Sequence, residues 1–127
     1  MRDKLVYEYA VIRFVPRVER EEFINVGVIL LCKRLDHLAM RVQLDEDRLR
    51  FLSPDVDLDE LQGHLHTWDL ICQGHPDGGP VALLDPANRF RWLTAPKSTM
   101  LQCSKVHPGL CQETRHVLDD LFRKYVL

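Results

Sequence analysis

The chain has 127 residues, of which 46% are hydrophobic and 28% are charged, and its formal net charge at pH 7 is −2. This length is typical of a single domain, here expected to span residues 1–127, and is sufficient to bury a core without disulfide bonds or metals. A weakly acidic chain lacks the bulk positive field on which many nucleic-acid-binding proteins depend, so the composition argues against that class.

Four cysteines are spread along the chain without the C-x-x-C spacing of a zinc ribbon or a thioredoxin-type site. Each lies in or beside an apolar run, which is typical of buried thiols in a reducing compartment. No apolar run approaches the ~20 residues that span a bilayer, and the first residues lead into a strand pattern rather than a signal peptide. We therefore expect a cytoplasmic protein with no membrane segment, no metal and no cofactor.

Two stretches near the N-terminus predict central strands. In Leu5–Val15 both faces of the alternating pattern are mostly apolar, and Pro16 ends the stretch by removing a ladder donor. In Phe23–Cys32, apolar and β-branched residues again occupy both faces. Gly27 within this stretch indicates a bulge or a close approach of another backbone. The charged segment Arg17–Glu22 connects the two strands and has room for a helical turn.

The middle of the chain predicts an edge strand followed by helices. His37–Leu44 alternates cleanly between apolar and polar residues, as a half-exposed edge strand does. Asp45–Leu52 predicts a short helical turn with Leu49 and Leu52 directed inward. Asp57–Gln73 has apolar residues at steps of three and four and acidic residues in its first turn, so an amphipathic helix is expected there.

The last third of the chain is harder to assign. Val81–Leu93 is ambiguous, although it contains an Asp-Pro pair that can start a helix. Ser98–Val106 predicts a fourth strand, which the turn His107-Pro108-Gly109 would follow. The final helix is expected over Gln112–Val126.

This order of elements favours an α+β fold. Three consecutive strands with short connections form an antiparallel meander, and the fourth strand returns to the sheet after a helical crossover. Placing it parallel beside the first strand, through a right-handed connection, gives the order 3-2-1-4. That order keeps the two apolar strands in the middle and the alternating strand at an edge, with the helices packed on the sheet.

The strand region holds two candidate sites. Asn25 is an amide on an otherwise apolar strand and must have hydrogen-bond partners. It either tethers the charged connection, with Gly27 admitting a crossing aromatic ring, or contacts a ligand. The carboxylates and arginines between Arg17 and Glu22 could work as an acid–base pair in a partly dry cleft, or they form a solvated, ion-paired surface.

Two further patterns have both a functional and a structural interpretation. Residues 89–92, Arg-Phe-Arg-Trp, could stack bases and clamp phosphates, or form a helix with core aromatics and surface arginines. Ser104 and His107 place a hydroxyl near an imidazole, but no G-x-S-x-G elbow accompanies them, which favours an end-of-strand turn. His64 and His66 are two residues apart on a predicted helix and would point apart, so they do not predict a metal site.

Three stretches together carry a resemblance to a known family. They are YAVIRFVP at 9–16 running into REEFINVGV at 20–28, RFRWLTAPKS at 89–98, and SKVHPGL at 104–110. In these stretches the chain resembles the bacterial domain-of-unknown-function family 3037 over nearly its whole length, with E-F-x-N-V-G-V as a specific motif. The signature positions that the resemblance implies are Arg13, Arg17, Glu22, Asn25, Gly27, Arg89, Arg91, Ser104, His107 and Gly109. Lys97 stands where the pattern prefers Arg, which would weaken a bidentate grip on an anion.

The resemblance implies no established activity, but it does imply a neighbour, because members of the family are often encoded beside HipA-like kinases. Our leading hypothesis is a non-enzymatic protein-interaction partner, either of a HipA-like kinase in a toxin–antitoxin-like setting or in a homo-oligomer. Its binding surface would combine Arg17–Glu22 with Arg89–Arg91.

Two alternatives remain open. The first is an enzyme that handles nucleotides or other phosphate ligands, in which Arg13, Arg17, Arg89 and Arg91 converge with Asn25 on one pocket. The second is nucleic-acid binding through the aromatic residues and arginines of residues 89–92.

Overall fold

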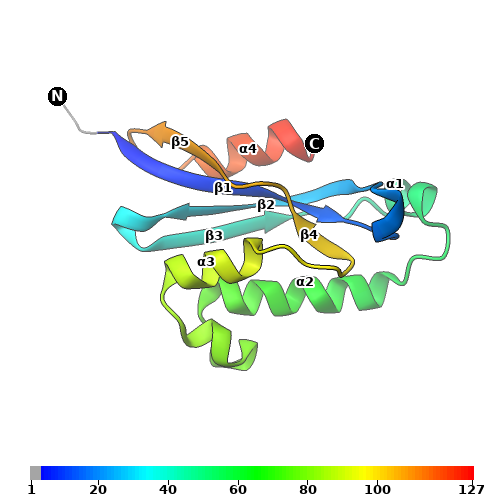
Figure 1. Cartoon of the computed structure of the whole chain (residues 1–127). Coiled ribbons are helices and arrows are strands. Elements are labelled where there is room, and N and C mark those ends of the chain that lie inside the picture. The colour runs from blue at the N-terminus through cyan, green and yellow to red at the C-terminus, as the bar shows by residue number, and fades with distance from the viewer. Residues whose placement is uncertain (1–3) are drawn as a thin grey trace.

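The computed structural model describes residues 4–127 as an α+β fold in which helices cover both faces of a five-stranded sheet (Figure 1). The strand order β3-β2-β1-β4 confirms the predicted order 3-2-1-4, and a further strand, β5, also pairs with β1. The strands are β1 (Leu5–Phe14), β2 (Ile24–Cys32), β3 (His37–Val42), β4 (Leu101–Cys103) and β5 (His107–Cys111).

The expected parallel pairing of the fourth strand is wrong, because β4 runs antiparallel to β1. Two helices of opposite direction precede it: α2 runs back beneath the sheet and α3 runs forward again (Figure 1). The chain therefore returns to the end of the sheet at which β3 finished, and β4 must run opposite to β1. The helices are α1 (Glu46–Leu52), α2 (Leu58–Gln73), α3 (Pro86–Thr94) and α4 (Val117–Tyr125).

The two faces of the sheet carry different cores. On one face, alternate side chains of β1 and β2 pack against α2, α3 and the buried Leu49 of α1. On the other face, a smaller apolar cluster joins Val28 and Leu30 of β2 to Leu121 and Phe122 of α4. None of the helices in the described residues is long and apolar enough to span a membrane.

Gly27 serves both purposes that its position predicts. The pairing of β1 with β2 shifts between Ile12 and Arg13, so that Val26 is an extra residue and β2 is bulged there. A Cβ on Gly27 would lie 2.5 Å from a side-chain methyl of Val42 and 2.7 Å from the carbonyl oxygen of Arg41, so both a side chain and the backbone of β3 approach closely there. The expected crossing aromatic ring is not what Gly27 accommodates.

The helix starts follow local capping chemistry. Asp57 and Asp85 accept backbone hydrogen bonds from Glu60 and Asn88, as N-cap residues do, at 3.0 Å and 3.1 Å. The ambiguous stretch after residue 80 resolves into a 3-10 turn, Pro80–Leu83, and then α3.

The C-terminal third differs most from its prediction. The fourth strand is only three residues long, and the helix predicted from residue 112 begins at Val117. The predicted turn at His107-Pro108-Gly109 is instead the start of β5. A proline is tolerated there because β5 pairs on one side only, with β1. Gly109 leaves room for the ring of Tyr7, which occupies the space that a Cβ would need.

Candidate functional site

The connection between β1 and β2 and the helix α1 meet at one end of the sheet, near the C-terminus (Figure 1). We call this region the α1 end and define it as residues 16–25, 45–55 and 126–127. Four predicted site residues lie in it or beside it. They are Arg13, Arg17, Glu22 and Asn25.

The β1–β2 connection is a tight turn rather than a flexible loop. Val18–Arg20 forms a single 3-10 turn, which confirms the predicted helical turn. Glu21 ends it in the left-handed region with φ of 55° and donates its backbone N–H to the carbonyl of Val18 at 3.2 Å. The side chains of Arg20 and Glu22 form an exposed ion pair. Such a pair stabilises a fold by ~1 kcal/mol or less. Because both side chains are exposed to solvent, the acid–base interpretation of this segment lacks the partly dry site that it requires.

Helix α1 is held by one buried side chain and its caps. Leu49 is fully buried, and Asp45 accepts the backbone N–H of Arg48 at 3.3 Å. Phe51 lies two residues from Leu49, about 200° around the helix, and 92% of it is exposed. Burying a phenylalanine side chain is worth ~1.5–3 kcal/mol. The fold does not use this gain.

Three hollows at the α1 end share residues and form one furrow around α1. The first, of about 380 Å³, is lined on one side by Arg17, Arg20 and Glu22 and on the other by residues 52–55. Leu52 also lines the second, an apolar hollow of about 420 Å³ beside Phe51. The third, of about 360 Å³, shares Ile24 and Arg48 with the second and reaches Asn25 and residues 126–127.

Arg13 and Asn25 face each other across β1 and β2 next to this furrow. The guanidinium carbon of Arg13 lies 4.1 Å from the centre of the half-exposed ring of Phe23. The amide nitrogen of Asn25 donates to the backbone carbonyl of Tyr125 at 3.0 Å, so Asn25 tethers α4 and not the charged connection. Within residues 4–127, the buried Arg13 Nε and Asn25 Oδ1 have no hydrogen-bond partner.

The arginines of residues 89–92 lie elsewhere, on α3. Arg89 donates to the carbonyl of Leu84 at 3.1 Å, and Arg91 is exposed. Phe90 is a core residue, 2% exposed, whereas Trp92 is 41% exposed and its ring is covered by the ammonium of Lys97 at 4.5 Å. This is the helix interpretation of the pattern, and it leaves no pair of free aromatic faces for stacking bases.

Lys97 does not hold an anion in this arrangement. Its ammonium donates to the backbone carbonyls of Trp92 and Ala95 and lies over the indole rings of Trp68 and Trp92. Burial lowers the pKa of this amine.

Ser104 and His107 do not form a nucleophile and its base. Ser104 is 7% exposed, and its hydroxyl accepts the backbone N–H of Val11 at 2.8 Å and donates to the carbonyl of Lys105 at 2.9 Å. Both hydrogen bonds stabilise the irregular backbone between β4 and β5. His107 is exposed, and its ring centre lies 5.5 Å from that of Tyr9.

The structure therefore divides the predicted residues among separate regions. Arg13 is on the α4 face of the sheet, because its neighbours Ile12 and Phe14 pack with α2 and α3. Arg17 is on the furrow and Arg89 is beneath the opposite face. The convergence of four arginines on one pocket is not found. For the same reason, Arg17–Glu22 and Arg89–Arg91 do not form one surface.

Residues 9–126 match the model of a family described as a protein of unknown function, DUF3037. The chain belongs to the DUF3037 family. No curated protein and no solved structure matches it. The DUF3037 match includes every strand and helix described above, apart from the first four residues of β1. It confirms the resemblance and provides no activity.

Sequence reasoning missed the central residue of the α1 end of this DUF3037 protein, Phe51. A signal was present, because Leu49 and Leu52 were expected to point inward, which leaves Phe51 on the outer side of the helix. Arg48 was also missed: it donates to the carbonyl of Val126 at 3.3 Å and joins α1 to the end of α4. No sequence pattern indicated that contact between segments 78 residues apart.

Proposed function

We propose that this protein is a non-enzymatic interaction partner that docks on another protein through its α1 end. The observation that carries the proposal is the 92% exposure of Phe51 beside an almost wholly apolar hollow. Of the exposed large hydrophobic side chains in the described residues, Phe51 is the most exposed, and Ile24 and Leu52 line the same hollow. Aromatic anchors in pockets dominate the energy of many interfaces.

The surroundings of Phe51 suit a protein partner better than a small ligand. The furrow continues for three hollows around α1, so it offers a long surface instead of one enclosed cavity. Arg17 and Arg48 lie on it, and arginine is enriched in interfaces. Among the described residues, neither arginine is in a salt bridge, so both are able to pair with carboxylates of a partner.

A HipA-like kinase is the partner that the family resemblance suggests, in a toxin–antitoxin-like setting. The support for it is associational. A second copy of the chain is the alternative occupant of the same surface. The phosphate-ligand enzyme and the nucleic-acid-binding protein receive no comparable support, because the arginines are separated and Phe90 is buried.

The first test compares Phe51→Ser with Leu83→Ser. Leu83 is also exposed but lies on the turn before α3, so it controls for a general loss of surface hydrophobicity. The tagged variants are mixed with the purified HipA-like kinase from the same genome, and binding is measured by calorimetry. We expect Phe51→Ser to weaken binding at least ~30-fold, as loss of a hot spot of 2 kcal/mol or more does, while Leu83→Ser binds like the wild type.

A second variant tests the charged rim. Arg17→Glu combined with Arg20→Glu reverses two charges on the furrow, and exposed substitutions of this kind change stability by ~0.5 kcal/mol or less. We expect binding to be lost with an unchanged melting temperature, whereas Arg91→Glu on α3 leaves binding intact. If the charge reversal unfolds the chain, these residues are structural, and if Phe51→Ser binds normally, the α1 end is not the docking surface.

A further inference from the structure

The outer edge of β3 presents free backbone groups. β3 pairs with β2 in antiparallel register, and Gln43 donates its N–H to Val26 at 2.8 Å. Because the direction of these groups alternates along a strand, the N–H and C=O groups of Leu38, Met40 and Val42 point away from β2. Among residues 4–127 these outward groups have no hydrogen-bond partner.

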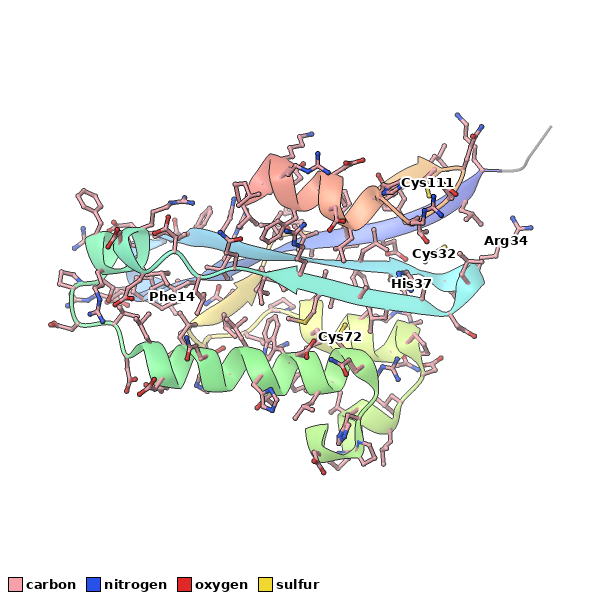
Figure 2. All side chains as sticks on the ribbon, turned by 180° about the vertical axis from the view of Figure 1, so that it is seen from behind. Phe14, Cys32, Arg34, His37, Cys72 and Cys111 are labelled. Carbon is pink, nitrogen blue, oxygen red and sulfur yellow. The ribbon has the colours of Figure 1, made fainter. Side chains whose placement is uncertain are left out.

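This edge lacks the features that normally prevent strands from pairing. The opposite edge of the sheet is broken between β4 and β5 and contains Pro108. β3 has no proline and no bulge in its pairing with β2, and its one arginine, Arg41, is engaged by Asp119 at 2.8 Å. Figure 2 shows β3 crossing the view between α4 and α2 with no other segment in front of it. An open, regular edge is a template for another strand.

A groove runs beside this edge, between β3 and α2. It has a volume of about 550 Å³. Its apolar lining comes from Met40, Val42, Leu44 and Leu65, and its polar lining from Gln43, Gln62, His66 and Asp69. A strand added to β3 would direct every second side chain into this groove, because side chains alternate between the two faces.

The charge of the groove selects the kind of strand. Asp69 is the one carboxylate in its lining, and it makes no salt bridge within the described residues. Helix α2 carries Asp59, Glu60 and Asp69 but neither lysine nor arginine. A second copy that paired edge to edge would bring two such acidic helices together. A segment with a lysine or arginine would instead place its aliphatic stem on Leu65 and its charge beside Asp69.

We propose that the β3 edge and α2 bind an extended peptide segment of a partner protein by strand addition. The segment has apolar side chains at alternate positions and a lysine or arginine that faces Asp69. The main-chain hydrogen bonds to Leu38, Met40 and Val42 provide affinity, and the groove provides specificity, as in other cases of strand addition. This site is separate from the α1 end and goes beyond the function proposed above.

Two synthetic peptides are the probes. Both are capped octapeptides of alternating valine and threonine, with either lysine or glutamate at one central valine position. We expect the lysine peptide to bind at least ~10-fold more tightly than the glutamate peptide by isothermal calorimetry. On binding, the amides of Leu38, Met40 and Val42 gain protection from hydrogen exchange, which a ligand lying only in the groove would not produce. Absence of binding at millimolar peptide, or binding without this protection, overturns the proposal.

Two matched pairs of variants separate the backbone from the charge. Met40→Ala and Met40→Pro both remove the methionine side chain, and only the proline also removes the outward N–H. Because that N–H points away from β2, neither substitution removes a hydrogen bond of the ladder to β2. We expect Met40→Pro to bind at least ~10-fold more weakly than Met40→Ala. Asp69→Lys should reverse the preference between the two peptides, while Asp59→Lys, on α2 but outside the groove lining, should not.

The remaining outcomes also decide the question. If Met40→Pro fails to fold, the Asp69→Lys reversal and the exchange protection still test the site. Equal binding by the two Met40 variants, or an unchanged preference in Asp69→Lys, contradicts strand addition. A dimer in light scattering that Met40→Pro dissociates would show that a second copy occupies the edge, and it would overturn the proposed occupant.

Discussion

The two faces of the sheet are stabilised in different ways. The face toward α2 and α3 is a continuous apolar core, whereas the α4 face combines a small apolar cluster with directional polar contacts. These contacts are the hydroxyl pair Tyr9–Tyr125 at 3.0 Å, the amide of Asn25 on Tyr125, and Arg41 on Asp119. Burial of apolar side chains therefore holds the helices on the first face, while a few placed polar groups help to hold α4 on the second.

The candidate residues follow this division. Arg13, Asn25 and His107 lie on the α4 face or at its border, where polar groups are already needed to hold the helix. Phe90 and Leu93, which belong to the signature stretch 89–98, lie in the core of the other face. Signature residues on the two faces should therefore respond very differently to substitution.

The largest effect is expected from a deletion in the α2/α3 core. Phe90→Ala removes a buried ring and should lower the free energy of unfolding by ~3–5 kcal/mol, measured by urea denaturation. Trp92→Ala, two residues along the same helix and 41% exposed, is the control and should cost much less. Equal costs for the two would contradict the assignment of Phe90 to the core and Trp92 to the surface.

A second difference should appear at alkaline pH. Burial raises the pKa of the Cys72 and Cys103 thiols from about 9 to about 12, and both lie on the α2/α3 face. The neutral thiols stabilise the fold below pH 9, and this contribution is lost as the pH rises toward 12. At pH 10.5 the loss should be on the order of 2 kcal/mol per thiol, from 1.36 kcal/mol per pKa unit.

The tyrosines of the α4 face provide the contrast. Their shared hydrogen bond raises the pKa of Tyr9 to about 12 and lowers that of Tyr125, so their contributions above pH 9 have opposite signs. In the variant Cys72→Ala/Cys103→Ala, we expect most of the fall in unfolding free energy between pH 8 and pH 10.5 to disappear. An undiminished fall would assign the alkaline transition to other groups. Figure 2 shows Cys72 on α2.

The smallest effect is expected at the hydroxyl pair. Tyr125→Phe removes the bond to Tyr9 without removing the ring and should cost ~1 kcal/mol, as a typical neutral hydrogen bond does. Hydrogen exchange should accelerate in α4 and stay unchanged in α2, because the bond joins α4 to β1. Tyr7→Phe is the control, since the Tyr7 hydroxyl makes no hydrogen bond within residues 4–127. Faster exchange in both helices would mean that the two faces unfold as one unit.

Much of the fold could be predicted from short-range patterns. The apolar residues on both faces of β1 and β2 require covering on both sides, which places these strands in the middle of the sheet. The apolar stripe of α2 and its capping aspartate predict that helix to within one residue. Of the candidate site, the charged connection and its helical turn were predictable, because they depend on residues next to one another in the sequence.

The sequence by itself thus determined the strand order, the main helices and the exposed charged turn, since each follows from local periodicity, capping and burial. Only the tertiary structure decided the direction of β4, because it depends on two helices that together return the chain to the same end of the sheet. It also decided that Pro108 lies in a strand, since a proline is acceptable only where an edge leaves its nitrogen unpaired. The tertiary structure likewise decided that Arg17 and Phe51 line adjoining hollows that share Leu52, while Arg89 lies on α3, because these positions result from packing between segments distant in the chain.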